Sequence, residues 1–462
     1  MDRRTFARRA VAVGLGAFAG CLDDSEPVPE ETPLDDPRGT ATPSDTPAQT
    51  AVSGTDTDTA APTDTESGAS DGADATATPA PPAEWSTFGA DSARTGSHPA
   101  GVGPSSGRIA WSALDAPAVL CPPTVADGVV YAGSAADAVH AVDADTGDSR
   151  WRFETSSDVE TAPAVADDRV YTADADGVVY ALSTDGEAVW THETGRTLHS
   201  RAVAVGDTRV FVGTGGDVPA TVDADALRAG TVIALDSDLG IPLWEFSGSE
   251  GSFTAPTLGD GRVFVGNHGG AVSALDADSG EQLWSWTAET GGVLASPTYA
   301  GGTLFVAVHG AGRVVALDAE GGERVWSKTL VAGNVKSSPA VTDERVYVGS
   351  HRTRGALTGG DRSAGTAGFR TGTAGRLYAL DRRDGRDLWV HEADHDFRSS
   401  PAVVGDTVYV GGGDGALAVA REDGTERWRV TFDDSVAASP AVADGRLFLG
   451  SADGSLYCVA DA

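Results

Sequence analysis

The sequence contains little cysteine and no long hydrophobic runs. Its three cysteines, Cys21, Cys121 and Cys458, cannot form a disulfide scaffold, and no CxxC or CxxCH pair is present for zinc or haem. No long amphipathic helix is recognisable. Apolar residues instead form short Val, Ala, Leu and Tyr runs among 59 glycines, which indicates many short strands and an all-β fold.

Positive charge is also scarce, since 33 Lys and Arg stand against 68 Asp and Glu, for a net charge of -35. Lys328 and Lys336 are the only lysines. An acidic surface repels nucleic-acid phosphates, so no nucleic-acid partner is expected. Acid excess with arginine in place of lysine resembles haloarchaeal proteins, which work in molar salt where charges are screened within about 3 Å. The charge would then reflect habitat rather than a partner.

The first 21 residues combine three export features in order. Arg3 and Arg4 begin a twin-arginine pattern, residues 10–19 form an apolar stretch too short to span a bilayer, and "FAGC" resembles a lipobox. An ordinary N-terminal helix is the alternative. The pattern predicts export in the folded state and lipidation of Cys21, which would anchor the protein on the outer face of the cytoplasmic membrane.

Residues 22–83 are rich in Thr, Pro and Ser and carry fourteen acidic residues against Arg38 alone. With almost no large apolar residue, no core can offset the entropy of ordering, so we expect a disordered tether. Residues 84–106 form a lead-in to the part that follows.

A phrase such as "AVDADTGDSRW" returns along the rest of the chain with regular spacings of 39 to 42 residues, and two longer spacings of 54 and 63 contain insertions. A period near 40 residues with four strand signals is typical of a propeller blade. The repeat tryptophans are Trp111, Trp151, Trp190, Trp244, Trp284, Trp326, Trp389 and Trp428.

The last unit ends after its third strand, while an additional tryptophan strand, "GRIAWSAL", precedes the first unit at residues 107–114. Pairing these two ends leaves no open sheet edge. We therefore expect residues 107–462 to form a monomeric, closed ring of eight four-stranded antiparallel blades.

The repeat Ala-x-Asp-x-x-x-Gly-x-x-x-Trp resembles the tryptophan-docking motif of the PQQ (quinoprotein dehydrogenase) propeller family, over residues 85–462. "EWSTFGADSARTGSHP" resembles the lead-in of exported archaeal members. The resemblance implies that each tryptophan fills a gap between blades, and that catalytic members bind PQQ and Ca²⁺ at the axis beside an adjacent-cysteine disulfide and a tryptophan. This chain has no Cys-Cys pair, and Trp286 is the only repeat tryptophan outside the docking register.

The architecture is also similar to BamB, the non-catalytic lipoprotein of the outer-membrane assembly machine. The favoured hypothesis is therefore an exported, membrane-anchored scaffold that binds a protein partner and needs no cofactor. Two alternatives stay open: an oxidoreductase dependent on PQQ and Ca²⁺, and a sensor or carrier of small ligands at the channel mouth.

Candidate binding residues fall on one face of the ring, where inner strands begin and second strands end. Insertions enter there in the third and sixth blades, and the second is rich in arginine, which indicates either docking or a solvated loop. Lys336 and Arg398 hold equivalent places in adjacent blades, so they either hold a carboxylate or phosphate or pair with Asp394 or Asp396. The other candidates are Arg201, Arg352, Arg354, Arg362 and Arg370.

Three histidines and two cysteines are further candidates, for a metal site and for a disulfide. His268, His309 and His351 follow the second strands of successive blades, but equivalent points lie roughly 9 Å apart whereas zinc needs nitrogens about 2 Å away, so no metal site is expected. Cys121 and Cys458 lie in neighbouring blades after closure, either as a disulfide or, as small buried residues, singly.

Overall fold

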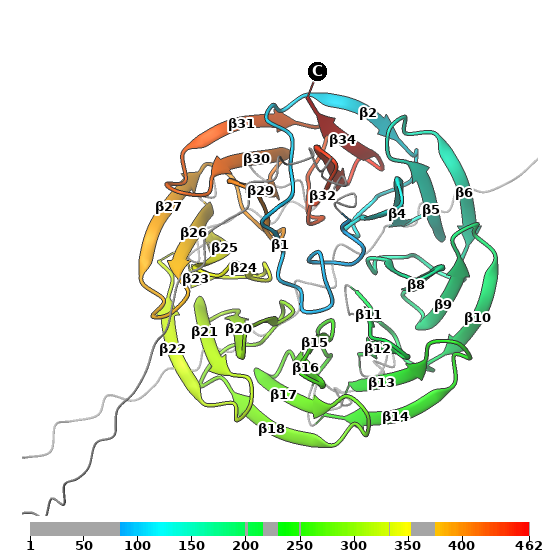
Figure 1. The fold of residues 1–462 in the computed structure, drawn as a ribbon, viewed down its shortest axis with the longest axis horizontal. Coiled ribbons are helices and arrows are strands. Elements are labelled where there is room, and N and C mark those ends of the chain that lie inside the picture. Colours follow the sequence, from blue (N-terminus) through cyan, green and yellow to red (C-terminus); the bar gives the residue numbers. More distant parts are fainter. Residues whose placement is uncertain are drawn as a thin grey trace, which may run out of the picture. The chain divides into compact units, whose positions relative to one another are not determined.

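The computed structural model describes residues 84–198, 202–215, 230–248, 251–331, 333–352 and 375–461. Over these residues the chain is all β and forms eight antiparallel four-stranded sheets, arranged as blades around a ring (Figure 1). Two of the sheets gain one short additional strand, β1 (Ser97–His98) and β23 (Gly333–Asn334). No membrane-spanning helix is found in the described part. The predicted eight-bladed propeller is confirmed.

The two inner positions of each blade are occupied by short strands that are mostly buried, because their Val, Ala, Phe and Tyr side chains pack against both neighbouring blades. The innermost strands of blades 1 to 8 are β3 (Thr124–Ala126), β7 (Ala164–Ala166), β11 (Ala204–Val205), β15 (Thr257–Gly259), β19 (Thr298–Ala300), β24 (Ala340–Val341), β28 (Ala402–Val404) and β32 (Ala441–Ala443). The second strands are β4 (Val129–Ser134), β8 (Arg169–Ala173), β12 (Arg209–Gly213), β16 (Arg262–Gly266), β20 (Thr303–Val308), β25 (Arg345–Arg352), β29 (Thr407–Gly412) and β33 (Arg446–Gly450).

The third strand of each blade is also mostly buried, whereas the outer strand is mostly exposed, with its docking tryptophan partly buried or, in blades 5, 6 and 7, buried. The third strands are β5 (Ala138–Asp143), β9 (Val178–Ser183), β13 (Thr231–Asp236), β17 (Ala271–Asp276), β21 (Arg313–Asp318), β26 (Gly375–Asp381), β30 (Gly415–Ala420) and β34 (Leu456–Ala460). The outer strands are β6 (Ser149–Glu154), β10 (Ala188–Glu193), β14 (Pro242–Ser247), β18 (Gln282–Thr287), β22 (Arg324–Thr329), β27 (Asp387–Ala393), β31 (Glu426–Thr431) and, for blade 8, β2 (Ile109–Ala113).

The ring closes as the repeat pattern predicts. The N-terminal strand β2 pairs antiparallel with β34, with Trp111 opposite Cys458 and Ala113 opposite Leu456. β2 therefore completes blade 8 as its fourth strand, and the sheet of blade 8 has the order β2-β34-β33-β32.

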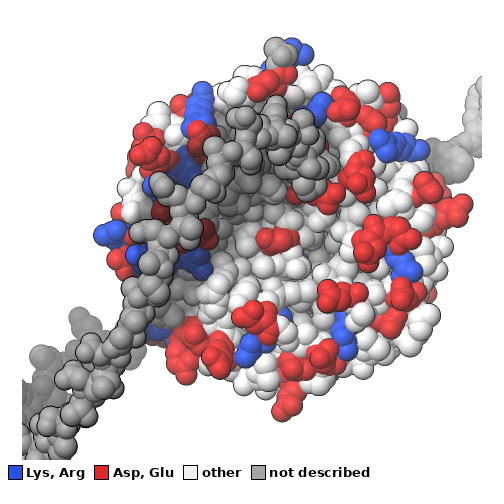
Figure 2. All heavy atoms as spheres, in the orientation of Figure 1, with Lys and Arg blue, Asp and Glu red and all other residues white. Residues whose placement is uncertain are grey.

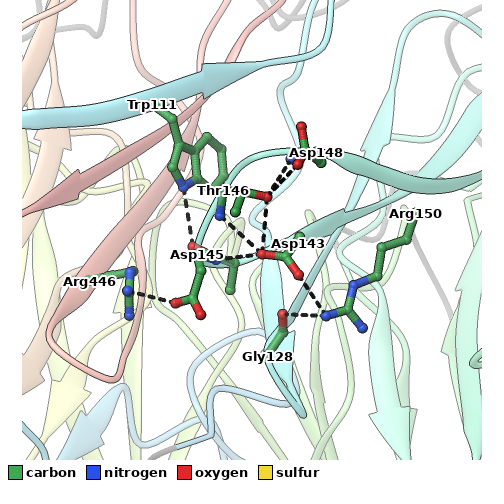
Figure 3. Close-up of polar contacts among 9 residues, drawn as sticks. Trp111, Gly128, Asp143, Asp145, Thr146, Asp148, Arg150 and Arg446 are labelled. Carbon is green, nitrogen blue, oxygen red and sulfur yellow. Dashed lines mark hydrogen bonds and ion pairs between the residues drawn. The ribbon is translucent and has the colours of Figure 1, made fainter.

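Seven of the eight docking tryptophans bind the turn of the next blade, as Trp111 illustrates (Figure 3), whereas Trp428 donates to the carbonyl oxygen of Pro104 in the lead-in. The indole Nε1 of Trp111 donates to the carbonyl oxygen of Ala144, at 3.2 Å, and its ring lies against Gly147, whose φ of 78° suits glycine. The turn itself is held by Asp143, whose Oδ1 accepts from the amides of Asp145 and Thr146, both at 3.0 Å. The Asp and Gly of the repeat thus shape a platform for the tryptophan of the preceding outer strand.

The lead-in lies inside the ring of inner strands (Figure 1). Its backbone carbonyls accept hydrogen bonds from inner-strand amides or the turns beside them in blade after blade, so it covers edges that would otherwise be unpaired. The donors in blades 1, 2 and 4 to 8 are Val125, Val165, Leu258, Tyr299, Val341, Val403 and Gly445.

Arg94 fixes the lead-in to the remaining blade. Its guanidinium is buried and donates to the carbonyl oxygens of Pro256 at 2.8 Å, Phe88 at 3.1 Å and Val203, of blade 3, at 3.2 Å. The lead-in therefore contacts all eight blades, a role that the sequence did not indicate.

Candidate functional site

Two of the predicted binding residues, Lys336 and Arg398, precede the inner strands of blades 6 and 7. The Ser338 amide, two residues after Lys336, donates to Oγ of Ser400, two residues after Arg398, at 2.9 Å. This bond joins equivalent points of the two blades. Lys336 and Arg398 are therefore neighbours on one face of the ring, as their alignment predicts.

Two histidines lie beside this pair. His309 follows β20 and His351 lies near the end of β25, and their rings stack with centroids 5.9 Å apart and an interplanar angle of 28°. The two ring centroids thus lie closer together than the roughly 9 Å expected for equivalent points of adjacent blades.

The backbone around the histidines holds their orientation. Nδ1 of His309 lies 3.1 Å from the carbonyl oxygen of Val335, and because a carbonyl can only accept, Nδ1 carries the proton. The next residue is Lys336. Asn334 pairs with His351 in the short β23–β25 ladder, and its Oδ1 accepts from the Gly310 amide at 3.0 Å.

The charged neighbours explain how these imidazoles titrate. Burial lowers the pKa of His351 to about 4; Asp396 raises it, while Arg398, His309 and Lys336 lower it further. Burial, together with Lys336, also lowers the pKa of His309. Both imidazoles are therefore neutral near pH 7. We call His309, Lys336, His351, Asp396 and Arg398 the cationic cluster.

Of the two acids considered as partners for Arg398, Asp396 is the one in contact, with Nη2 to Oδ2 at 3.4 Å. Asp394 instead contacts His395 at 3.1 Å and Arg429 at 3.3 Å. Arg398 therefore forms an ion pair with Asp396 and also belongs to the cationic cluster.

Most of the other predicted site residues lie outside the described ranges. Arg352 ends β25, and only its backbone, opposite Gly333, is described. The arginine-rich insertion thus begins directly next to the cationic cluster. Cys21, Arg201, Arg354, Arg362 and Arg370 lie outside the described residues.

A group of opposite charge lies in blades 1 and 2. Asp158 lies beside Asp137, Glu160 and Asp176, and burial followed by the hydrogen bond with Asp137 raises its pKa to about 6. Asp137 and Asp176 lie between the second and third strands of their blades, as His309 does in blade 5. This acidic group lies in other blades than the cationic cluster, on a molecule whose rim is mainly acidic (Figure 2).

Trp286 occupies a second packing position between blades, two residues after the docking Trp284 on β18. Phe153 and Phe246 hold the same position in β6 and β14 and pack on Tyr180 and Phe253, at centroid distances of 5.8 and 6.0 Å. Trp286 lines a shallow surface hollow together with Glu289, Arg313 and Arg324. The register of Trp286 is thus explained by packing.

Both repeat-region cysteines are buried and unpaired. Cys121 precedes β3 rather than lying in it, and its Sγ accepts from the Gly133 amide at 2.9 Å. Burial raises the thiol pKa of Cys121 and of Cys458 to about 12. The single-cysteine alternative is the one observed.

The described residues do not fit PQQ and calcium as the resemblance implies. No group of three His, Cys, Asp or Glu in the described ranges is placed to hold a metal ion. The docking tryptophans belong to outer strands, as does Trp286, away from the axis.

Comparison with known proteins supports the fold. The model of the family described as outer membrane protein assembly factor BamB matches residues 100–226, 203–295, 268–368 and 373–462, so matches extend over most of the chain. The chain belongs to this family. No curated protein matches the sequence.

Solved structures of BamB-family and dehydrogenase propellers are similar to the chain at low sequence identity. BamB from Moraxella catarrhalis is 18% identical with a TM-score of 0.60, and the match covers 77% of this chain and 99% of BamB. Quinohemoprotein alcohol dehydrogenase from Comamonas testosteroni is 17% identical with a TM-score of 0.67, over 82% and 81% of the two chains. A europium-containing methanol dehydrogenase is 15% identical with a TM-score of 0.64, over 82% and 98%. At these identities the likeness concerns the fold alone.

Proposed function

We propose that the protein is an exported, membrane-anchored and non-enzymatic scaffold that binds a protein partner on the face that carries the cationic cluster. The observation that carries the proposal is the position of Lys336 and Arg398 as neighbours at the base of an arginine-rich insertion, on a molecule with net charge -35. A local reversal of charge on an acidic protein favours recognition of an acidic segment. The family description, an assembly factor, supports a scaffold role.

The test is cross-linking capture in molar KCl from the membrane fraction of the source organism. The intact protein is compared with a variant lacking residues 353–374 and with a control lacking the blade 3 insertion, residues 216–229. We expect a defined partner whose yield falls at least fivefold in the first variant and stays unchanged in the control. Equal yields from all three proteins would contradict the proposal.

The enzyme alternative is tested by titration of residues 84–462 with PQQ and Ca²⁺. We expect no bound-quinone absorbance and no rise in melting temperature. Tight stoichiometric binding, with reduction of a dye in the presence of alcohols or sugars, would replace the scaffold by a quinoprotein oxidoreductase.

The anchor is tested by Cys21→Ser, which removes the thiol that lipidation requires. We expect this variant to leave the membrane fraction and to appear in the medium. Cys121→Ser is the matched control, because Cys121 is buried inside the propeller, and it should stay in the membrane fraction. Retention of the Cys21 variant would show another means of attachment.

A further inference from the structure

Two interfaces between neighbouring blades are filled by pairs of aromatic rings that the chain itself supplies. Between blades 7 and 8, Phe432 stacks on Tyr457, with centroids 4.3 Å apart and an interplanar angle of 18°. Between blades 1 and 2, Phe153 packs edge-on against Tyr180, with centroids 5.8 Å apart. Offset-stacked and edge-on pairs of this kind are the arrangements that aromatic rings prefer.

Between blades 4 and 5, the corresponding positions hold small side chains. Val315 has the register of Tyr457, since each lies one residue before the partner of an aromatic residue in the second strand. Ala288 corresponds to Phe432, since each lies four residues after a docking tryptophan and its amide donates to the turn between the second and third strands of its blade. The shallow hollow that Trp286 lines therefore lies where a stacked aromatic pair lies in another interface.

In both aromatic interfaces the tyrosine hydroxyl donates to a carboxylate. Tyr180 donates to Oδ2 of Asp174 at 2.7 Å, and Tyr457 donates to Oδ2 of Asp453 at 2.8 Å. Oγ of Ser156 also lies 3.2 Å from the Tyr180 hydroxyl. These positions thus combine a flat apolar surface with polar partners for a phenol hydroxyl.

Glu289 supplies a carboxylate at the hollow. It lies five residues after its docking tryptophan, as Ser156 does, and its side chain lines the hollow. Its carboxylate oxygens lie 3.3 Å from Arg313 and 3.8 Å from Arg324. A carboxylate has about four acceptor sites, so these two ion pairs leave capacity for a hydroxyl donor. The guanidinium groups also suit an aromatic ligand, because their planes stack on aromatic rings.

We propose that this hollow binds a tyrosine side chain of the protein partner, with its ring against Trp286 and Val315 and its hydroxyl donating to Glu289. The proposal rests on the proposed function, since it assigns the tyrosine to the partner. Val308, which also lines the hollow, directly precedes His309 of the cationic cluster. A tyrosine is favoured over a saccharide because the corresponding positions in the other interfaces hold aromatic rings.

Binding is measured on the intact chain by NMR of the indole N–H groups, with N-acetyl-L-tyrosinamide as the probe. The chain has ten tryptophans, and the spectrum of Trp286→Phe identifies the Trp286 signal. We expect this signal to shift and to saturate. Trp111 and Trp428, whose indoles donate to backbone carbonyls in blade 1 and the lead-in, are internal controls and should not shift. N-acetyl-L-phenylalaninamide should bind about threefold more weakly or less, because it lacks the hydroxyl.

Two variants connect the response to the site. Val315→Tyr places a ring of the chain itself in the hollow, as Tyr457 does between blades 7 and 8, and should abolish the response to tyrosinamide. Glu289→Ala should reduce the difference between the two amides to less than about twofold, because the carboxylate acceptor is lost. Glu281→Ala, at an exposed residue of the same blade, is the matched control and should keep the full difference.

Melting temperatures confirm folding, and the Trp286 response of the unaltered protein decides the matter if a variant does not fold. Absence of that response, an equal response of Trp111 and Trp428, or an unchanged response in Val315→Tyr would overturn the proposal. Methyl glucoside is the saccharide arm, and a stronger response to it than to tyrosinamide would overturn the assignment to tyrosine. No partner protein is present, so failure here leaves the scaffold proposal standing, and failure to capture a partner leaves the binding of the phenol ring standing.

Discussion

Arg94 illustrates how one residue can organise a segment that has no regular structure. Its three donated bonds reach the lead-in itself and blades 3 and 4, and burial lowers its pKa to about 9. Because the guanidinium is charged and fully enclosed, its carbonyl partners replace the water that it gives up on folding.

Arg94→Ala should lower the free energy of unfolding by about 3–5 kcal/mol, since it leaves three buried carbonyls without their donor. Denaturant unfolding in molar KCl measures the change. Arg108→Ala, at an exposed residue directly before β2, is the control and should change stability by less than about 0.5 kcal/mol. Equal effects of the two substitutions would refute the anchoring role.

His140 should make stability depend on pH. It is 8% exposed, its Nε2 lies 2.9 Å from Oγ of Ser134, and burial, with Arg152, lowers its pKa to about 4. The folded protein therefore favours the neutral ring. Its contribution is complete above the ordinary pKa of about 6.5 and is lost as the pH falls toward 4.

We expect wild type to lose about 2 kcal/mol more than His140→Asn between pH 7 and pH 4. Asp158, whose pKa is raised to about 6, acts in the opposite direction but equally in both proteins. Below pH 4 the two proteins should lose stability in parallel, since Asp143 and Asp406 have pKa values of about 2. Identical curves above pH 4 would contradict the assignment.

At the scale of elements, β2 and the lead-in stabilise different edges of the same ring. β2 covers the outer edge of blade 8, and the lead-in covers the inner strands of the blades. A chain that begins at residue 107 should keep a closed ring but melt about 10 °C or more below one that begins at residue 84. A chain that begins at residue 115 exposes the edge of β34 and should associate or aggregate.

Thermal melts and light scattering measure the two effects. If the chain that begins at residue 107 has the same melting temperature as the chain that begins at residue 84, the lead-in does not stabilise the ring. If the chain from residue 115 stays monomeric, closure by β2 is dispensable.

The blades could be predicted because their pattern is local: Asp143, Gly147 and Trp151 lie within one turn and one strand, and the same phrase returns in other blades. The path of the lead-in could not, because it binds through backbone carbonyls, which any residue has. Alignment of the repeats on their proline predicted that Lys336 and Arg398 hold equivalent places in adjacent blades. It missed how close His309 and His351 lie, because side-chain direction is not visible in a repeat.

The molecule as a whole carries a net charge of -35, so its own repulsion opposes the compact state. Salt should relieve this, since the screening length falls from about 10 Å at 0.1 M to about 3 Å at 1 M. We expect the melting temperature to rise steadily between 0.1 and 2 M KCl. Sucrose of equal osmolality is the control. A flat response to KCl, or one that sucrose matches, would contradict the role of charge.

The pairing of β2 with β34 joins strands that are made at opposite ends of synthesis. With chain elongation at about 5–20 residues per second, Trp111 leaves the ribosome some tens of seconds before its partner Cys458 exists. Until then β2 lacks its partner strand, and the lead-in lacks its contacts with the later blades. The ring can therefore close only after β34 has been translated.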